Sequence, residues 1–202
     1  MLKTTNNRLF FPSIFLFALL FSCTVLAGEA TDRIKATTDK LIEIVTNHEL
    51  DPPEMENKRY HMIKEAVDMV FDWEAFSQRA IGKHWRKLNR EERKEFIFLF
   101  GRLIERTYMD KTRKYSGEQI RFVNEKTDKK YGTVEAIVTT KYGMEVEVRY
   151  SVIKKNGSWF VYDLHVEGIS LGFIYRVQFN SIMITSSYNG LLKRLKTKID
   201  EG

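Results

Sequence analysis

The chain has 202 residues, of which 43% are hydrophobic, and it contains three Pro, eleven Gly and a single Cys. This length favours one domain, and the composition excludes collagen-like, low-complexity and disulfide-stabilised proteins. Its 33 Lys and Arg outnumber its 27 Asp and Glu, which gives a net charge of +6.

Residues 1–27 have the pattern of a secretory signal peptide. Lys3 and Arg8 give a positive start, an apolar run covers residues 9–21, and slim residues precede a cleavage point after Ala27. The run is shorter than the roughly 20 residues that cross a bilayer, so we expect export, cleavage and a single domain over residues 28–202. The alternative is a lipoprotein acylated at Cys23, because residues 20–23 loosely resemble a lipoprotein cleavage box.

Removal of the signal peptide changes what the composition allows. Loss of Lys3 and Arg8 lowers the net charge from +6 to +4, and loss of Cys23 leaves no cysteine. Thiol catalysis and thiolate metal sites are thereby excluded. The mixed-sign charge argues against nucleic-acid binding and leaves open a mild attraction to anionic membranes.

The periodicity of apolar residues predicts helices, then strands, then helices. The expected helices are residues 30–50, ended by Pro52 and Pro53; 60–71; a short one from Asp72, its N-cap, to Gly82; 89–115, with a capping box of Asn89 and Glu92; one after Gly168; and a last one starting near Asn189. The expected strands are residues 120–124, 133–141, 144–154 and 158–167.

The third strand alternates clearly. Met144, Val146, Val148, Tyr150 and Val152 share one face, which is typical of an antiparallel sheet with one buried and one solvated side. The order of elements predicts an α+β fold in which several helices cover a curved sheet of about four antiparallel strands.

Signals for catalysis are weak. The four His residues lack the spacing of a metal site, and no nucleophile elbow or phosphate-binding loop occurs. Asp163 and His165 point to the same side of one strand, as a base and its orienting group would. They can equally be polar residues on the solvent side, because no nucleophile accompanies them.

Aromatic residues are abundant: nine Phe, nine Tyr and three Trp lie after residue 27. They can form an ordinary filled core, or they can line a cavity for an apolar ligand with Tyr hydroxyls at its mouth. The pattern leaves both interpretations open.

Several motifs occur in register along the chain: Phe71-Asp72-Trp73, residues 79–86, Glu95-Phe96, Tyr108, Tyr150, Trp159, Tyr162-Asp163, residues 167–171, Tyr175-Arg176, Phe179 and residues 191–195. Together they resemble the MlaC family of periplasmic phospholipid-binding proteins, also called toluene-tolerance proteins. Trp73 and Phe76 depart from the family's more usual Phe and Met, and nothing is transferred to residues before Phe71.

The resemblance implies a soluble periplasmic carrier, without catalytic activity or cofactor, whose cargo is phospholipid. It implies helices packed on a sheet around an apolar cavity. The implied partners are an inner-membrane ABC transporter with an MCE-domain protein and an outer-membrane lipoprotein–porin complex, in maintenance of outer-membrane lipid asymmetry. A monomer suits such a carrier. The leading alternative is a cavity-bearing enzyme that acts on a lipid or small apolar substrate through Asp163 and His165.

On this interpretation the acyl chains lie between the long helix and the buried sheet face. The expected contacts are Phe96, Phe100, Leu103, Tyr108, Val148, Tyr150, Trp159 and Tyr162. The headgroup is expected in water near Arg149 or Arg176.

Overall fold

The computed structural model describes residues 28–112 and 115–201. The expected signal peptide, its cleavage point and Cys23 lie outside the described residues. The described helices are α1 (Glu29–Thr46), α2 (Glu56–Asp68), α3 (Trp73–Ile81), α4 (Arg90–Thr112), α5 (Leu171–Thr185) and α6 (Tyr188–Glu201), with 3-10 turns η1 (His48–Leu50), η2 (Pro53–Met55) and η3 (Gly82–Lys87). The strands are β1 (Gln119–Thr127), β2 (Tyr131–Thr139), β3 (Glu145–Lys155), β4 (Ser158–Val166) and β5 (Ile169–Ser170).

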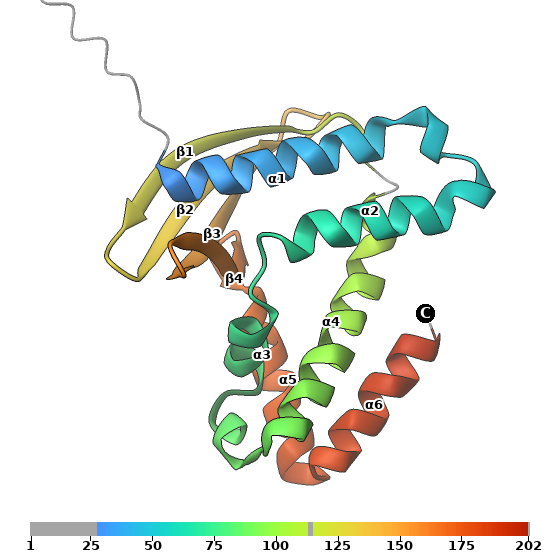
Figure 1. Cartoon of the computed structure of the whole chain (residues 1–202), viewed down its shortest axis with the longest axis vertical. Coiled ribbons are helices and arrows are strands. Elements are labelled where there is room, and N and C mark those ends of the chain that lie inside the picture. Colours follow the sequence, from blue (N-terminus) through green and yellow to red (C-terminus); the bar gives the residue numbers. More distant parts are fainter. Residues whose placement is uncertain (1–27, 113–114, 202) are drawn as a thin grey trace, which may run out of the picture.

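The elements form two halves, which confirms the α+β class (Figure 1). In the upper half, α1 crosses one face of the sheet and contacts both β1 and β4, while α2 lies beside α1. The lower half consists of α3, α4, α5 and α6, and α3 and α5 also contact β4. The long helix α4 extends from the level of α2 to the lower end of the molecule.

The strands of the described residues form one sheet in the order β1-β2-β3-β4-β5, with every pair antiparallel. Four of these strands match the expected ones, and the two-residue β5 was not expected. The register shifts twice: between Phe122 and Asn124 where β1 pairs with β2, and opposite Ser151 and Val152, where β4 has an extra residue. Such a bulge turns two successive side chains to one side of the strand, so Tyr162 and Asp163 both lie on the face opposite Tyr150.

The expected helix ends are largely confirmed. Asn89 Oδ1 accepts from Glu92 N at 2.9 Å and Glu92 Oε2 accepts from Asn89 N at 2.8 Å, which is the complete capping box. The Asp72 side chain accepts from Ala75 N at 3.0 Å and caps α3. The same helix ends at Ile81, and its C-cap Gly82 has a φ of 58°, which is strained for residues with a Cβ.

The first helical hairpin differs from the expectation. The helix expected over 30–50 ends at Thr46, because Asn47 adopts an extended backbone and its side chain accepts from Glu49 N. The following helix begins at Glu56 rather than near Tyr60, because the 3-10 turn that starts at Pro53 leads directly into it.

Apolar side chains of the described residues gather in three clusters. The helical cluster lies between α3, α4, α5 and α6 and includes Phe76, Phe96, Phe100 and Leu191, each fully buried. The sheet cluster joins Ala30 and Ile34 of α1 to the sheet, and the hairpin cluster joins α1 to α2. None of the described helices is long and apolar enough to span a membrane.

Candidate functional site

Among the described residues, one face of the sheet is more deeply buried at one end than at the other. Its inward row on β2 and β3 begins with Val134 and Val152, which are fully buried against α1. Towards the other end of the same face, Val138, Val146 and Val148 remain partly exposed. We call Val138, Val146, Val148, Tyr150 and Leu164 the open apolar face. These residues are the part of the sheet on which an apolar ligand would bury surface.

α1 is held at its position by polar contacts as well as by packing. Thr31 donates from its N and its Oγ1 to Glu125 Oε2, at 2.7 and 2.6 Å. Lys154 pairs with Glu29 at 2.7 Å, and Arg33 donates to the carbonyl of Met69 at 2.6 Å. The carboxylate of Glu125 at the N-terminus of α1 also suits the helix dipole.

Tyr150 marks the boundary between the covered and the open part of this face. Its ring packs against the sheet cluster and lies 6.4 Å from the ring of Phe122. Burial raises the pKa of Tyr150 to about 12. The phenol therefore stays neutral at physiological pH and offers an amphipathic ring beside the open valines.

Phe71 links the sheet to the helical half. It packs against both the sheet cluster and the helical cluster, and its ring lies 4.6 Å from Trp73 and 5.2 Å from Phe76. Its neighbours Val70 and Asp72 hydrogen-bond to the backbone of Val161 in β4. The two apolar clusters are therefore continuous at this residue.

A second pair of Tyr residues lies on the helical side. The side chains of Tyr108 and Tyr175 hydrogen-bond to each other, and burial raises the pKa of both, that of Tyr175 to about 12. The ring of Tyr175 meets Phe100 edge-on at 4.9 Å. Half-buried Tyr108 is thus the point where α4 offers a hydroxyl next to an apolar surface.

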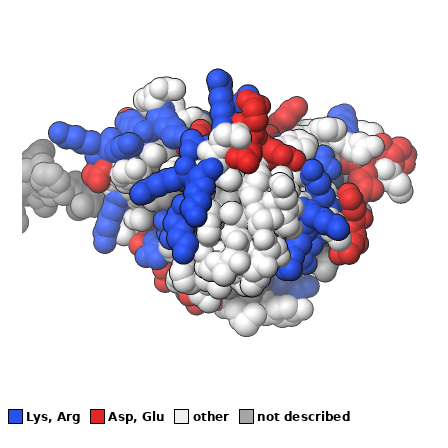
Figure 2. Space-filling view, turned by 90° about the horizontal axis from the view of Figure 1, so that it is seen from below, with Lys and Arg blue, Asp and Glu red and all other residues white. Residues whose placement is uncertain are grey.

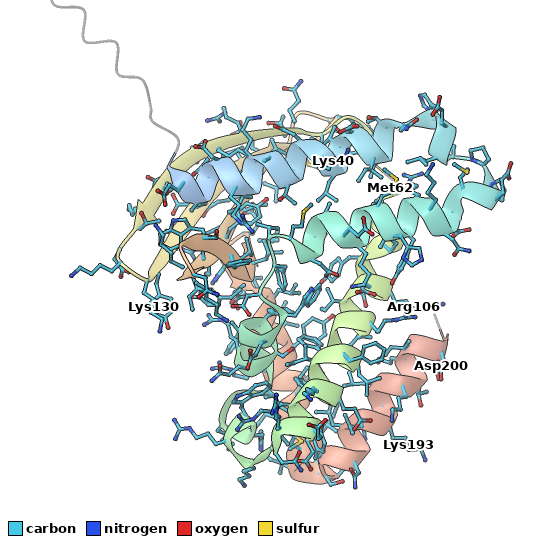
Figure 3. All side chains as sticks on the ribbon, viewed as in Figure 1. Lys40, Met62, Arg106, Lys130, Lys193 and Asp200 are labelled. Carbon is cyan, nitrogen blue, oxygen red and sulfur yellow. The ribbon has the colours of Figure 1, made fainter. Side chains whose placement is uncertain are left out.

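The structure separates the expected acyl-chain residues into groups. Phe96 and Phe100 are fully buried and pack on Phe76 and Phe179, so protein side chains already fill their surroundings. Leu103 belongs to the same cluster at 8% exposure. Figure 3 shows side chains filling the space between these helices.

The remaining four residues lie on the sheet or beside it. Val148 and Tyr150 share the open apolar face, whereas Trp159 is buried under α1 in the sheet cluster. Tyr162 is on the opposite face, where its ring lies 6.2 Å from that of Tyr131. Tyr108, Val148 and Tyr150 are therefore the expected residues outside the opposite face that are themselves partly exposed, whereas Leu103 is buried.

The two expected headgroup arginines lie away from Tyr150. Arg149 points to the opposite face, where its Nη2 is 3.3 Å from His165 Nδ1. Arg176 is on α5 and donates from Nε to the carbonyl of Arg79 at 2.8 Å.

Asp163 is buried, contrary to its interpretation as a solvent-side residue. Its carboxylate pairs with Arg79 and accepts from Ser170 Oγ at 2.6 Å and from Gly172 N at 2.9 Å. This network joins α3, β4 and the start of α5. It was missed from the sequence because Arg79 lies 84 residues before Asp163 in the chain.

The contacts of His165 do not have the geometry of a catalytic relay. Its Nε2 faces both Ser151 Oγ, at 3.2 Å, and Asp163 Oδ2, at 3.6 Å, while Arg149 occupies Nδ1. In a relay the carboxylate and the nucleophile occupy different ring nitrogens. Burial lowers the pKa of His165.

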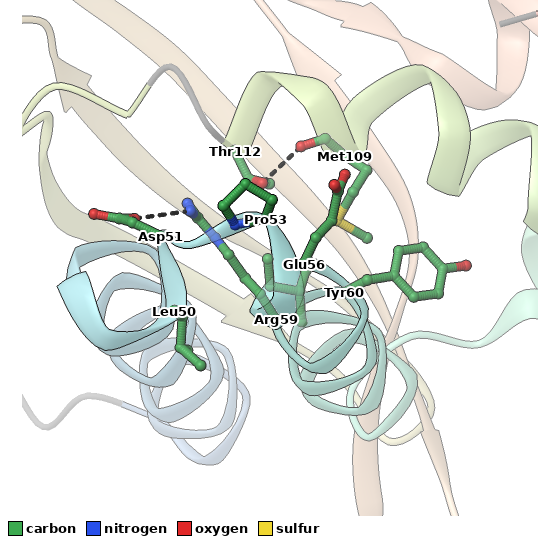
Figure 4. A pocket seen from close by; sticks show the side chains of 9 residues that line it. Leu50, Asp51, Pro53, Glu56, Arg59, Tyr60, Met109 and Thr112 are labelled. Carbon is green, nitrogen blue, oxygen red and sulfur yellow. Dashed lines mark hydrogen bonds and ion pairs between the residues drawn. The ribbon is translucent and has the colours of Figure 1, made fainter.

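A small, partly open hollow lies between the α1–α2 connection and the end of α4 (Figure 4). Its volume is about 160 Å³, and its lining includes Arg59, which donates to Asp51 at 3.3 Å, as well as Leu50 and Tyr60. This is smaller than the roughly 300–1,000 Å³ of ligand pockets, so it does not suit a diacyl lipid. Among the described residues no three of His, Cys, Asp and Glu gather as metal ligands would.

Comparison with known proteins decides the family. The model of the MlaC protein family matches residues 35–197, which is most of the chain. The chain belongs to the MlaC family. The resemblance drawn from the sequence motifs is confirmed.

Two curated relatives of this MlaC-family chain match at low identity. One is the intermembrane phospholipid transport system binding protein MlaC of Haemophilus influenzae, 26% identical over 98 residues, which are 46% of this chain and 46% of that protein. The chain thus spans about half the length of this relative. The other is the toluene tolerance protein ttg2D of Pseudomonas putida, 26% identical over 79% of this chain and 75% of that protein.

A solved structure shares the MlaC-family fold. The phospholipid-binding protein of Ralstonia solanacearum, in complex with a phospholipid, matches with a TM-score of 0.76 and 20% identity. The match covers 86% of this chain and 98% of that chain. At this identity the likeness establishes the fold.

Proposed function

We propose that this protein is a periplasmic phospholipid carrier, exported after cleavage behind Ala27, that acts without catalysis or cofactor. The observation that carries the proposal is the open apolar face of an MlaC-family chain, whose residues on β2 and β3 remain partly exposed while Val134 and Val152 on the same face are buried. The phospholipid-bound neighbour of the same fold supports this assignment.

The acyl chains are proposed to lie in an apolar cavity on the open apolar face. Val148 and Tyr150 would contact them from the sheet, and Leu103 and Tyr108 from α4. Phe96, Phe100 and Trp159 would then support the site from within filled clusters, because their surroundings are already occupied. Arg149 and Arg176 are proposed headgroup contacts. Because both lie away from Tyr150, the headgroup would have to extend past the edge of the sheet to reach them.

The physical need for a carrier is large. A diacyl lipid exposes about 30 methylenes, worth about 25 kcal/mol at about 0.8 kcal/mol each, so it does not cross water unaided at a useful rate. A carrier has to offer comparable apolar burial and still release its cargo. Release then requires a pocket that changes volume or a partner whose pocket aligns with it.

The transport route is part of the proposal. As a monomer the carrier would move phospholipid between an outer-membrane lipoprotein–porin complex and an inner-membrane ABC transporter with an MCE-domain protein. This exchange would maintain outer-membrane lipid asymmetry. The name of the Haemophilus influenzae relative, which places it in an intermembrane transport system, supports the route.

Native mass spectrometry tests the binding function. The full chain is expressed in a bacterium with an outer membrane and purified as the cell processes it, and we expect added masses of intact phospholipids. Protein that is consistently unliganded in gentle purification would overturn the proposal. The intact mass also separates cleavage after Ala27 from acylation at Cys23.

A matched pair of substitutions tests the site. Val148→Arg puts a charge on the open apolar face, and we expect it to remove most bound lipid while the protein still folds. Val123→Arg is the control, because Val123 is a strand residue that is 40% exposed and is not one of the five residues of this face. Equal lipid content in the two variants would place the acyl chains elsewhere.

A further inference from the structure

Helix α5 leaves an apolar stripe uncovered. Phe173, Val177 and Ile184 are 57%, 55% and 66% exposed. They occur at i, i+4 and i+11, so they lie along one face of the helix, and half-exposed Ile174 borders them. We call Phe173, Val177 and Ile184 the α5 stripe.

The α5 stripe is separate from the side of α5 that packs into the core. The opposite side of the helix carries Tyr175 and Phe179, which are buried in the helical cluster. The outer side of the helix therefore carries exposed apolar residues, with the uncharged polar residues Asn180 and Ser181 between Val177 and Ile184, whereas a surface helix usually has a polar outer face rich in charge. Over Leu171–Thr185 its sequence contains one charged residue, Arg176, and no acid.

A basic hollow adjoins this stripe. Its volume is about 570 Å³, and it lies between α3, η3, the sheet and α5. Four of its lining residues are cations, Arg79, Lys83, Arg86 and Arg176, and none of the described residues that line it is acidic. Tyr131 and Tyr162 form its aromatic wall.

The hollow and the stripe are held together by specific contacts. Arg176 lines the hollow and lies on α5 between Phe173 and Val177 in the chain. Its Nε binds the carbonyl of Arg79 at 2.8 Å, and Asn180 Oδ1, one turn further, is 2.9 Å from His84 Nε2 in η3. The apolar stripe therefore runs directly beside the cations.

Cations at the edge of apolar surface are a wider feature of this end of the molecule. Figure 2 views the lower end of the helical half, where uncharged surface lies between groups of Lys and Arg. Asp and Glu lie mainly along the top and the right-hand side of this view (Figure 2).

We infer that the α5 stripe and the basic hollow form a docking surface for a bilayer containing anionic phospholipids. Apolar side chains enter the acyl boundary while Lys and Arg at their edge meet lipid phosphates, as in helices that lie in the membrane interface. A protein partner with an acidic rim would use the cations too, but it would not need an uncharged stripe one whole helix long. This docking is distinct from carriage of a lipid in a cavity.

Vesicle co-sedimentation tests the docking surface. The full chain, purified as the cell processes it, is mixed with phosphatidylglycerol vesicles or with phosphatidylcholine vesicles. We expect binding to phosphatidylglycerol that weakens as salt is raised, and far weaker binding to phosphatidylcholine. Failure to bind phosphatidylglycerol vesicles at low salt would overturn the inference.

Substitutions identify the surface. Val177→Glu and Ile184→Glu should each weaken binding about tenfold, and Val177→Ser should weaken it without adding a charge. Met69→Glu is the matched control, because Met69 is 62% exposed at the end of α2. An equal effect of Met69→Glu would mean that added charge alone acts, and would contradict the assignment.

The cations are tested in the same way. Lys83→Gln should weaken binding about fivefold, whereas Lys58→Gln, an exposed position on α2, should change it less. A second copy of the chain is the alternative occupant of the α5 stripe, and light scattering of the free protein tests it. A dimer that dissociates on Val177→Glu would show that a second copy covers the stripe and would contradict the inference. Bound lipid, measured on the same samples, reports separately on the carrier function.

Discussion

Arg79 of α3 and Asp163 of β4 form an ion pair in which the carboxylate is fully buried and the arginine side chain is 35% exposed. Ser170 and Gly172 donate to the same carboxylate, so one side chain joins a strand to two helices. A buried charge of this kind stabilises a fold only while all of its partners are present.

Replacement of Asp163 should therefore be costly. Asp163→Ala leaves Arg79, the Ser170 hydroxyl and the Gly172 N–H without their acceptor, and we expect a loss of about 3–5 kcal/mol in the free energy of unfolding. Asp163→Asn keeps one carbonyl acceptor and should lose less. Urea unfolding measures both.

The control for Asp163 is Asp39→Ala. Asp39 pairs with Lys35 one turn away on α1, and its side chain is 59% exposed. Such a pair contributes about 0.5 kcal/mol or less. If the two alanine variants lost the same stability, the network around Asp163 would not hold the two halves together.

Gly82 is expected to be sensitive for a different reason. Its φ of 58° disfavours any residue with a Cβ, and an added Cβ would lie 3.3 Å from Arg176 Nε. Gly82→Ala should cost about 1–3 kcal/mol and loosen the Arg176–Arg79 hydrogen bond. Gly143→Ala is the comparison, since Gly143 also has positive φ but meets nothing within 4 Å. Thermal unfolding should place Gly82→Ala well below it.

Tyr150 gives a prediction for alkaline pH. Its pKa is raised to about 12 by burial, so above about pH 10 the unfolded chain loses this proton while the folded protein keeps it. Stability then falls by about 1.4 kcal/mol for each pH unit between about 10 and 12. Between neutral pH and about pH 11, the free energy of unfolding should fall by roughly 1.4 kcal/mol less in the Tyr150→Phe variant than in wild type.

This alkaline effect has a simple check. Tyr142→Phe removes a phenol that is 77% exposed in the β2–β3 turn, and its pH dependence should match wild type. Guanidinium unfolding at both pH values gives the comparison. Identical curves for Tyr150→Phe and Tyr142→Phe would show that Tyr150 is not desolvated in the folded state.

The capping box of α4 should contribute measurably. Asn89→Ala removes the acceptor of the Glu92 N–H and should cost about 1 kcal/mol. Asn57→Ala, an exposed position within α2, removes no such cap and is expected to be near neutral. A cost for Asn89→Ala no larger than that for Asn57→Ala would contradict the assigned cap.

Features specified by neighbouring residues could be predicted from the sequence. Asn89 and Glu92 predicted the start of α4 because their hydrogen bonds are local, and the alternation from Met144 to Val152 predicted one face of β3. The end of α1 at Thr46 could not be predicted, because apolar residues continue at helical spacing to Leu50. The two residues of β5 are too few to show a period.

The candidate site was harder to predict because it depends on contacts between distant segments. Phe100 and Tyr150 are both aromatic, and only their tertiary neighbours show that one is in a filled cluster and the other beside an open face. Strict alternation along β4 places Tyr162 on the face of Tyr150, and this expectation was wrong. The single extra residue of the bulge reverses the alternation, so Tyr162 lies on the opposite face. The α5 stripe could have been found from the sequence, because the residues of α5 include a single charge, that of Arg176.

The continuity of the two apolar clusters through Phe71 has a consequence for how the molecule can empty. The buried members of both clusters pack against other side chains of the protein. The open apolar face lies at the margin of the sheet cluster. If the proposed site is correct, unloading would expose a limited strip of valines and leave the folding cores intact, so a cycle of filling and emptying would not pass through an unfolded chain.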